Sequence, residues 1–449
     1  MLSDDLMKRQ LTVPLISLGL AAILVHGIVL FLVIPAFTSR LMPFYGQDGY
    51  IDGYDLIAAN LVAGNGYRFY PATARTLMRE PGYPMLLAGI RLVFGSAFVA
   101  VKLVNMLLAL AVAWMMTLIA RRLSSNQTMI LAAPLLYLFH PGTIIAESRG
   151  GVEILFTSLI TLFMLTLYRA IEHNRRWDYV VSGAVLGLAV VVKSTPLLFP
   201  IVLLIYFIVC RRGWAPKLAA SGRIVLMVIT TLVVLSPWII RNYELTGQFV
   251  PTASVLGVSA HAGQYICMHL DNNKSWMQLD REAARERAQL ATQLGYPFED
   301  DVYYQSFYNS KNELQFSAYL MTKVVHEYKM SPMLFVRCVR SNMFNFWCAG
   351  KTVRSTRANI AIQLPYLVLA IMGVLACVRN GQASIIGLLV VFIIYFVAVY
   401  VPILAQARYS MPLIPFLSIF AGCALAEAYG KLGRLGGVVV GRSTPVLEK

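Results

Sequence analysis

Three aspartates near the start of the chain are the first residues whose types and spacing suggest chemistry. Asp48, Asp52 and Asp55 stand at positions i, i+4 and i+7 of one segment. If that segment is helical, the three carboxylates share one face, and Gly64 or Gly66 can end the helix in the left-handed conformation. A row of acids of this kind can take or orient a proton. A helix N-cap followed by a dipole-compensating acid on a solvated face would give the same spacing.

The elements that must position these acids are membrane helices. Of the 449 residues, 58% are hydrophobic and 13% are charged, and the mean hydropathy is +0.65. The charged fraction is about half that of an ordinary soluble protein, which excludes a soluble fold. Several uninterrupted apolar runs have the length, about 20 residues, that an α-helix needs to cross a bilayer. The sequence therefore predicts an all-α integral membrane protein, because helices satisfy their own backbone in lipid.

We expect about ten transmembrane helices with both chain ends on the cytoplasmic side. The N-terminal apolar run lacks a small-residue cleavage site, so it is expected to stay as the first span. Short amphipathic helices at 85–94 and 333–347 are expected in the outer membrane interface, and further helices at 280–294 and 313–328 in a small outer region. The expected spans are residues 11–37, 97–120, 128–145, 154–168, 179–192, 196–209, 224–238, 358–378, 384–401 and 411–429.

The net charge of +16 is explained by this topology and does not call for a nucleic-acid partner. Lys and Arg collect in the cytoplasmic loops of membrane proteins. The expected cytoplasmic segments hold 16 basic residues, whereas the short outer turns hold three, Arg149, Lys193 and Arg408. The 16 are Lys8, Arg9, Arg121, Arg122, Arg169, Arg175, Arg176, Arg211, Arg212, Lys217, Arg223, Arg379, Lys431, Arg434, Arg442 and Lys449.

This topology divides the chain into three parts. Residues 1–240 form an N-terminal transmembrane module whose first outer loop is 38–96. Residues 241–357 form an extracytoplasmic loop region, and residues 358–449 supply the last transmembrane helices and a cytoplasmic tail.

Ionisable groups collect at the outer ends of the expected spans. Besides the three aspartates they are Arg79, Glu80, Glu147, Arg149, Glu153, Lys193, Arg241 and Arg408. Charge at membrane depth is costly and tends to mark function, although Arg149 and Lys193 could instead snorkel to the headgroups. A lipid-linked phosphate that leaves a sugar needs cations where its negative charge develops. The attacking hydroxyl or amine needs a carboxylate for its proton. One acid and two or three cations therefore suffice for a transfer reaction.

The motifs around these groups resemble those of a known family. The run D-G-Y-D-L-I-A-A-N-L-V-A-G-N-G-Y, followed by R-E-P-G-Y-P, resembles the first extracytoplasmic loop of polytopic GT-C glycosyltransferases. The nearest branch is the bacterial one related to protein O-mannosyltransferases and lipid A aminoarabinose transferases. P-W-I-I-R-N and A-R-Y-S-M-P-L-I-P resemble later motifs of this branch. Because these motifs follow in order along the whole chain, the resemblance implies a GT-C fold.

The resemblance also implies roles for individual residues. Asp52 matches the base at the start of the first outer helix, Asp48 is the second candidate, and Glu153 matches a second acceptor-site carboxylate. Lys193 stands where relatives often carry arginine, so the charge is kept but bidentate phosphate binding is lost. The residues implied to bind the donor phosphate and sugar are Arg79, Glu80, Lys193, Arg241, Asn242, Arg408 and Tyr409. The two aspartates could hold a divalent ion, but the closer relatives work without one, and no metal or other cofactor is expected.

The expected function is that of an inverting glycosyltransferase. It would move a hexose or pentose from a polyprenyl-phosphate carrier to a cell-envelope acceptor: a glycan, a lipid or a protein. The expected location is the bacterial cytoplasmic membrane, among membrane lipids, with the active site facing the periplasm or the exterior. One alternative is a lipid or glycolipid transporter or flippase, which predicts charges near mid-membrane and Gly/Pro-broken helices in repeated halves. Another is an inactive GT-C-like binding protein, which would lack the acidic pair of Asp52 and Glu153.

Overall fold

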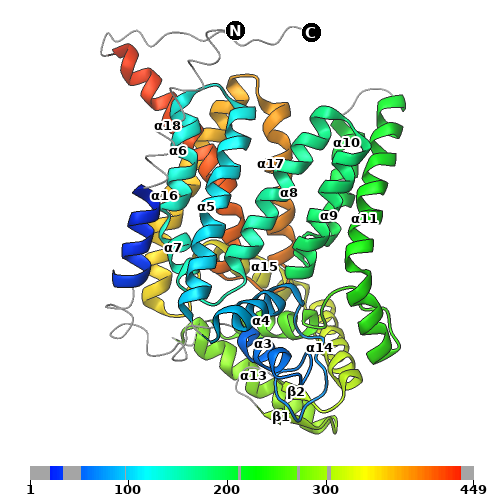
Figure 1. Ribbon diagram of the computed structural model, residues 1–449. Helices are drawn as coiled ribbons and strands as arrows, with labels where there is room; N and C mark the ends of the chain where they lie inside the picture. Colours follow the sequence, from blue (N-terminus) through cyan, green and yellow to red (C-terminus); the bar gives the residue numbers. More distant parts are fainter. Residues whose placement is uncertain are drawn as a thin grey trace.

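A bundle of long helices forms the body of the protein (Figure 1). The computed structural model describes residues 21–33, 52–96, 98–210, 214–270, 274–300 and 305–435. The bundle helices are α5 (Phe98–Leu123), α6 (Gln127–Leu138), α8 (Glu153–His173), α9 (Arg176–Val192), α10 (Phe199–Cys210), α11 (Trp214–Thr246), α16 (Val353–Arg379), α17 (Ala383–Tyr400) and α18 (Ile414–Leu435). Each covers an apolar run that the sequence predicts as a span, so hydrophobic length decides where these helices form.

Within the described residues, five helices are long and apolar enough to cross a membrane. They are Phe98–Leu123, Glu153–His173, Ser221–Thr246, Val353–Arg379 and Ala407–Lys431. Helix α6 and the short α7 (Pro141–Glu147) make a sixth candidate that is bent by 50°. Shorter apolar helices are Ala21–Val33, Gly82–Phe94, Thr195–Val209 and Ile385–Tyr400. The chain is therefore a multi-pass membrane protein; the full set of ten spans stays a prediction.

The bend between α6 and α7 has a local cause. Pro141 is the first residue of α7, where its missing N–H is not needed. The His140 side chain caps the new helix, because its Nδ1 accepts the backbone N–H of Gly142 at 3.1 Å. The sequence predicts one span over residues 128–145, whereas the helix breaks at His140, where this cap starts a new helix.

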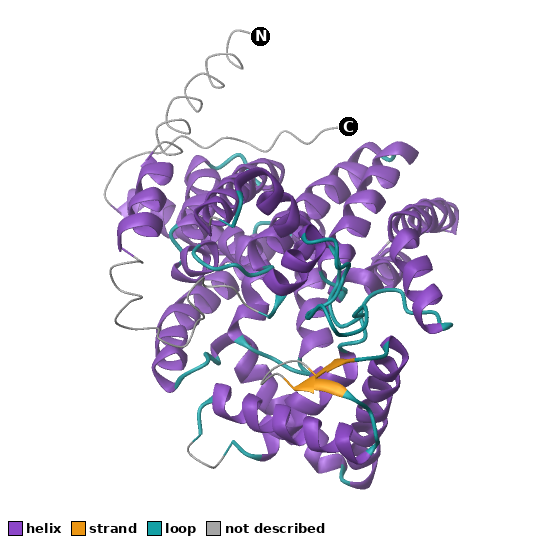
Figure 2. Ribbon diagram, turned by 60° about the horizontal axis from the view of Figure 1, so that its bottom comes forward, coloured by secondary structure: helices purple, strands orange, loops and turns teal. Residues whose placement is uncertain are grey.

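A layer of shorter helices covers one end of the bundle (Figure 1). It contains α3 (Tyr54–Val62), α4 (Gly82–Phe94), α12 (Leu256–Met268), α13 (Trp276–Gln293), α14 (Ser310–Met330), α15 (Pro332–Cys348) and the strands β1 (Phe298–Asp300) and β2 (Gln305–Phe307). Figure 2 shows the two strands lying among helices at this end. They pair antiparallel, with Phe298 opposite Phe307. The expected helices at 280–294, 313–328 and 333–347 are confirmed, whereas strands this short were not anticipated. We call this end the outer end, after the side of the membrane on which the sequence analysis expects these segments.

Helix α11 corrects the expected end of the seventh span. The sequence predicts that this span stops at Trp238, but α11 continues to Thr246 and contains Pro237 in its interior. Proline inside a membrane helix is tolerated when neighbouring groups satisfy the freed backbone. Arg241 and Asn242 consequently lie on the last turns of a long helix that leads from the bundle into the outer layer.

Helix α18 lies at the centre of the bundle. In the most apolar stretch of Ala407–Lys431, which contains most of α18, 78% of the residues are buried, compared with 28% in α11 and in α16. Gly373 of α16 packs so closely on α18 that a Cβ there would lie 1.7 Å from the carbonyl oxygen of Phe420. Small residues allow this close helix approach in membranes. The 3₁₀ segment η3 (Ala407–Leu413), which leads into α18, is therefore held inside the protein, and it carries Arg408.

Candidate functional site

Asp52 lies in a turn and not in a helix. Its φ is 64° and that of Gly53 is 70°, and α3 starts only at Tyr54. Aspartate is one of the few residues that tolerate this left-handed conformation. The expectation that Asp52 and Asp55 share one helical face is therefore wrong, and Asp48 lies outside the described residues. The turn allows the Asp52 carboxylate to reach another element of the fold.

The predicted end of α3 is confirmed. Gly64 has a φ of 78°, and the N–H of the residue after it bonds to the carbonyl of Asn60 at 2.9 Å. This is the left-handed helix end that the glycines of the motif indicate. The following loop returns the chain to the R-E-P-G-Y-P motif.

Asp52, Arg408 and Glu153 meet at the outer end of the bundle. The Asp52 carboxylate accepts two hydrogen bonds from the Arg408 guanidinium, with N···O distances of 2.6 and 3.2 Å. The same guanidinium lies 3.6 Å from Glu153, the first residue of α8. The three side chains are 25%, 21% and 8% exposed, so solvent screens them only in part. Three segments far apart in sequence thus form one charged cluster.

The charges around Asp52 keep its carboxyl ionised. Burial alone would raise the pKa of Asp52, but Arg408 and then Arg79 more than offset it and hold this pKa well below the ordinary value. Asp52 is therefore a carboxylate at every physiological pH, and a weak base as long as Arg408 stays in place.

Lys193 enters the same region from α9 and is surrounded by aromatic rings. Its Nζ lies 4.5 Å from the ring centre of Tyr409, 5.4 Å from that of Tyr400 and 5.9 Å from that of Phe156. The first two rings stack on each other at 4.9 Å. Within the described residues, no carboxylate lies within ion-pair distance of Lys193, and burial lowers its pKa. Aromatic faces stabilise such a cation and leave its charge available to an anion.

The first two residues of the R-E-P-G-Y-P motif contact the backbone of Asp52 and the backbone next to Lys193. Arg79 donates from Nε to the backbone oxygen of Asp52 at 3.2 Å, and its guanidinium lies over the Tyr54 ring at 5.7 Å. The Glu80 carboxylate accepts the backbone N–H of Ser194 at 2.9 Å, next to the lysine at the end of α9. Arg79 is thus close to the acid, while Glu80 fixes the turn that carries the lysine.

The glycine of this motif permits the close approach to α9. A Cβ on Gly82 would lie 2.6 Å from Cγ2 of Val192 and 3.0 Å from the carbonyl oxygen of Val191. We expect Gly82→Ala to displace the loop, to lower the free energy of unfolding by roughly 1–3 kcal/mol and to reduce activity severalfold. Gly89→Ala on the same helix is the matched control, since nothing lies within 4 Å of its Cβ position. Thermal unfolding in detergent checks this; equal melting temperatures for the two variants would refute the packing argument.

Arg241 and Asn242 bind backbone carbonyls of two segments, one just before the R-E-P-G-Y-P motif and one just after α11. Arg241 donates to the carbonyl of Thr76 at 3.0 Å and lies over the Trp238 ring at 4.3 Å. Asn242 donates to the carbonyl of Thr252 at 3.1 Å and is fully buried. These contacts give both residues a positioning role for the segment that leads to the R-E-P-G-Y-P motif. Direct binding of phosphate by Arg241 stays a prediction.

Lys351 belongs to the same region but was missed in the sequence. It lies in the turn between α15 and α16, and its carbonyl accepts the N–H of Met277 at 3.2 Å. Two residues earlier, the carbonyl of Ala349 accepts the N–H of Ala407 at 3.0 Å, beside Arg408. Burial, followed by repulsion from Arg408, lowers the pKa of Lys351 to about 8. Only the capping box after it, which begins at Thr352, signalled a turn here.

Comparisons with known proteins agree with this architecture. Residues 78–240, about a third of the chain, match the family model described as dolichyl-phosphate-mannose-protein mannosyltransferase. No curated protein matches the sequence. A solved structure of the Archaeoglobus fulgidus oligosaccharyltransferase tethered with an acceptor peptide is similar, with a TM-score of 0.56 and 13% identity over 94% of this chain and 50% of that chain. AglB from the same organism, in complex with an inhibitory peptide and a dolichol-phosphate, is similar with a TM-score of 0.55. The sequence identity is 13%, and the match covers 96% of this chain and 52% of that chain.

A more distant likeness is to ArnT from Cupriavidus metallidurans bound to undecaprenyl phosphate, with a TM-score of 0.43 and 15% identity over 94% of this chain and 80% of that chain. The chain spans about half the length of the oligosaccharyltransferases that it matches. At these identities the structural likeness establishes the fold alone. The family match over residues 78–240, together with the shared fold, confirms the resemblance to GT-C glycosyltransferases, and the matched segment contains Arg79, Glu80, Glu153 and Lys193.

Proposed function

We propose that this chain, which shares the fold of an archaeal oligosaccharyltransferase and the mannosyltransferase pattern over residues 78–240, is a membrane glycosyltransferase. It moves a monosaccharide from a polyprenyl-phosphate carrier to an acceptor at the outer end of the bundle. The observation that supports this most is the convergence of Asp52, Glu153, Arg408 and Lys193 in one half-buried cluster. The cluster supplies an acid for the acceptor proton and two cations for the phosphate leaving group, which suffices for such a transfer.

The reaction follows from these groups. An acceptor hydroxyl or amine attacks the anomeric carbon of the sugar from the face opposite the phosphate. The bond between that carbon and the phosphate oxygen breaks, the phosphate leaves with the bonding electrons, and the configuration inverts. The proton of the acceptor passes to Asp52, while Glu153 orients the acceptor. Lys193, Arg408 and Arg79 offset the negative charge that develops on the phosphate.

Donor binding itself prepares the base. In the structure the terminal nitrogens of Arg408 donate two hydrogen bonds to the Asp52 carboxylate. The buried Nε of Arg408 has no hydrogen-bond partner among the described residues. A phosphate that takes donors from Arg408 removes hydrogen bonds and positive charge from Asp52. The pKa of Asp52 then rises toward its ordinary value, and the carboxylate becomes a better proton acceptor. Proton transfer is thus restricted to the complex that already holds the donor.

The membrane arrangement completes the proposal. Ten spans are reached when the helices Ala21–Val33, α9, α10 and α17 also cross the bilayer, with both chain ends cytoplasmic. The outer end then faces the periplasm or the exterior of a bacterial cell, where lipid-linked sugars and cell-envelope acceptors meet. The acceptor is a glycan, a lipid or a protein of the envelope, and the reaction proceeds without a metal ion.

Mass spectrometry of lipid-linked sugars and envelope glycans tests this proposal in cells. Deleting the gene is expected to make one polyprenyl-phosphate sugar accumulate and to remove that sugar from one envelope glycan, lipid or protein. Wild-type protein restores both pools. If neither pool changes while the acceptor pathway is active, the proposed function is refuted.

Lys351 predicts an alkaline limit of activity. Its pKa of about 8 means that the side chain loses its positive charge as the pH rises through this value. The anionic donor is then held less tightly, so KM for the donor is expected to rise above pH 8. Lys351→Arg keeps the charge, so the pH at which KM for the donor starts to rise is expected to increase by at least ~1 pH unit. Lys351→Met is expected to give a high KM for the donor at every pH. An unchanged KM profile in both variants would remove Lys351 from the donor site.

A further inference from the structure

A cavity lies at the opposite end of the bundle from Asp52. It is open between α5 and α8 and has a volume of about 500 Å³, within the usual range for a ligand site. Its lining residues are Leu118, Arg121, Arg122, Leu162, Leu165, Thr166 and Arg169. Arg169 follows Glu153 by 16 residues along α8, which is about 24 Å along the helix axis. One phosphate group therefore cannot lie at the Asp52 cluster and between the arginines of this cavity at the same time.

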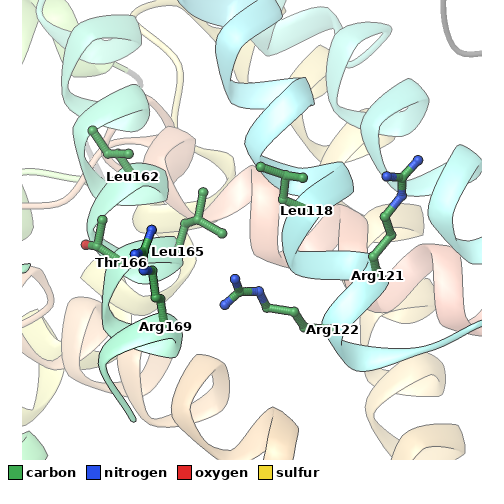
Figure 3. Close-up of a pocket in the computed structure, with 7 residues that line it drawn as sticks. All are labelled: Leu118, Arg121, Arg122, Leu162, Leu165, Thr166 and Arg169. Atoms are coloured by element: carbon green, nitrogen blue, oxygen red, sulfur yellow. The ribbon is translucent and has the colours of Figure 1, made fainter. Parts of the chain in front are cut away.

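Two arginines face each other across the cavity. Figure 3 shows Arg122 extending from α5 toward α8, where Arg169 stands beside Thr166. Arg122 binds Glu172 through one terminal nitrogen at 3.2 Å, and Arg169 binds Asp178 through Nε at 3.0 Å. The terminal nitrogens of Arg169 have no hydrogen-bond partner in the part of the chain that the structure describes. The lining itself contains no carboxylate. Paired guanidiniums of this kind suit a phosphate group.

The apolar residues of the cavity continue from the arginines toward the middle of the bundle. On α5, Trp114, Leu118 and Arg122 are four residues apart and share one face. The side chain of Trp114 is 58% exposed there. On α8, Leu162 and Leu165 precede Arg169 on the face that lines the cavity. Both helices are long and apolar enough to span a membrane, and their arginines lie near their ends. Charge at the helix ends with an apolar stripe behind it matches a headgroup followed by an acyl chain.

We propose that this cavity binds one anionic phospholipid in the leaflet that faces away from the Asp52 site. The lipid phosphate lies between Arg122 and Arg169, and an acyl chain lies along Leu118, Leu162 and Leu165. A free phosphate ion would leave this apolar wall unfilled. The inference does not depend on the proposed glycosyl transfer.

Native mass spectrometry of the full chain in detergent tests this site. Phosphatidylglycerol and phosphatidylcholine with the same acyl chains are added separately. The wild-type protein is expected to retain one phosphatidylglycerol about tenfold better than phosphatidylcholine, a difference of ~1.4 kcal/mol. The double variant Arg122→Gln/Arg169→Gln is expected to lose this preference. The combination Arg175→Gln/Arg176→Gln is the charge-matched control, because these two exposed arginines lie at the same end but outside the cavity. It should bind like the wild type.

Three outcomes would overturn the proposal. The first is equal retention of phosphatidylglycerol by the wild type and the double variant, and the second is equal retention of the two lipids by the wild type. The third is displacement of the bound lipid by inorganic phosphate, which would identify a site for a free ion. If the double variant does not fold, Leu165→Trp decides, since it fills the cavity and keeps both arginines. Loss of the lipid in that variant supports the proposal, and retention refutes it.

Discussion

The Asp52→Asn variant is expected to lose at least ~10²-fold in kcat, because an amide cannot accept the proton of the acceptor. Donor binding should remain close to that of the wild type, since Arg408, Lys193 and Arg79 all stay in place. Arg408 keeps Glu153 as a partner, 3.6 Å away, so the variant is also expected to fold. Single-turnover transfer, measured beside donor binding, separates these two effects.

Asp55→Asn is the matched control for this experiment. Asp55 lies in the first turn of α3, whereas Asp52 lies in the left-handed turn before it. If the two aspartates shared a helical face, their substitutions would have comparable effects. The structure instead predicts that Asp55→Asn keeps kcat within about twofold, at the cost of a few tenths of a kcal/mol in helix stability. Full activity in Asp52→Asn would refute its assignment as the base.

Arg408→Lys is expected to reduce kcat/KM by ~10²-fold, because an ammonium cannot form the two parallel bonds that the guanidinium makes. Arg408→Gln is expected to lower stability as well as activity, since it leaves Asp52 and Glu153 as two mostly buried carboxylates without the Arg408 cation. Its free energy of unfolding is expected to fall by ~3 kcal/mol, the lower end for breaking a buried pair, since both partners are partly exposed. Kinetics and thermal unfolding measure these losses.

The acid dependence of stability provides a second readout. The folded-state pKa of Asp52 lies below its ordinary value of 3.8, so this ion pair stabilises the protein above that pH and stops doing so as the pH falls below it. The wild type should lose this contribution on acidification, and Arg408→Gln should show a smaller acid-induced loss. Arg175→Lys, an exposed arginine at the other end of the bundle, serves as the control. Wild-type kinetics and an unchanged acid profile in the Arg408 variants would contradict the central ion pair.

The helices of the bundle could be predicted because their apolar length alone decides where they form. The region from Phe98 to Leu123, for example, is recognisable from composition. What the sequence did not reveal depends on local caps and tertiary contacts. The break at Pro141 needs the His140 side chain as a cap, and the continuation of α11 past Trp238 depends on how its surroundings satisfy the backbone.

The sequence indicated which residues belong to the candidate site, but it did not indicate how they are arranged. Motif resemblance brought Asp52, Glu153 and Arg408 together, and the structure places them in one cluster. Spacing within the first loop could not show that Asp52 leaves the helix, because that conformation depends on contacts with Arg79 and η3 far along the chain. Lys351 carries no motif, and only the fold places its turn beside Arg408.

Release of polyprenyl phosphate by the purified protein in liposomes tests the central claim most directly. The donor is the polyprenyl-phosphate sugar that accumulates in cells lacking the gene, and the acceptor is the envelope fraction of the same cells. The wild type is predicted to release one polyprenyl phosphate for each sugar transferred, and Asp52→Asn is predicted to release it at least ~10²-fold more slowly. Passage of intact donor across the bilayer without such release would contradict the transferase and identify a transporter.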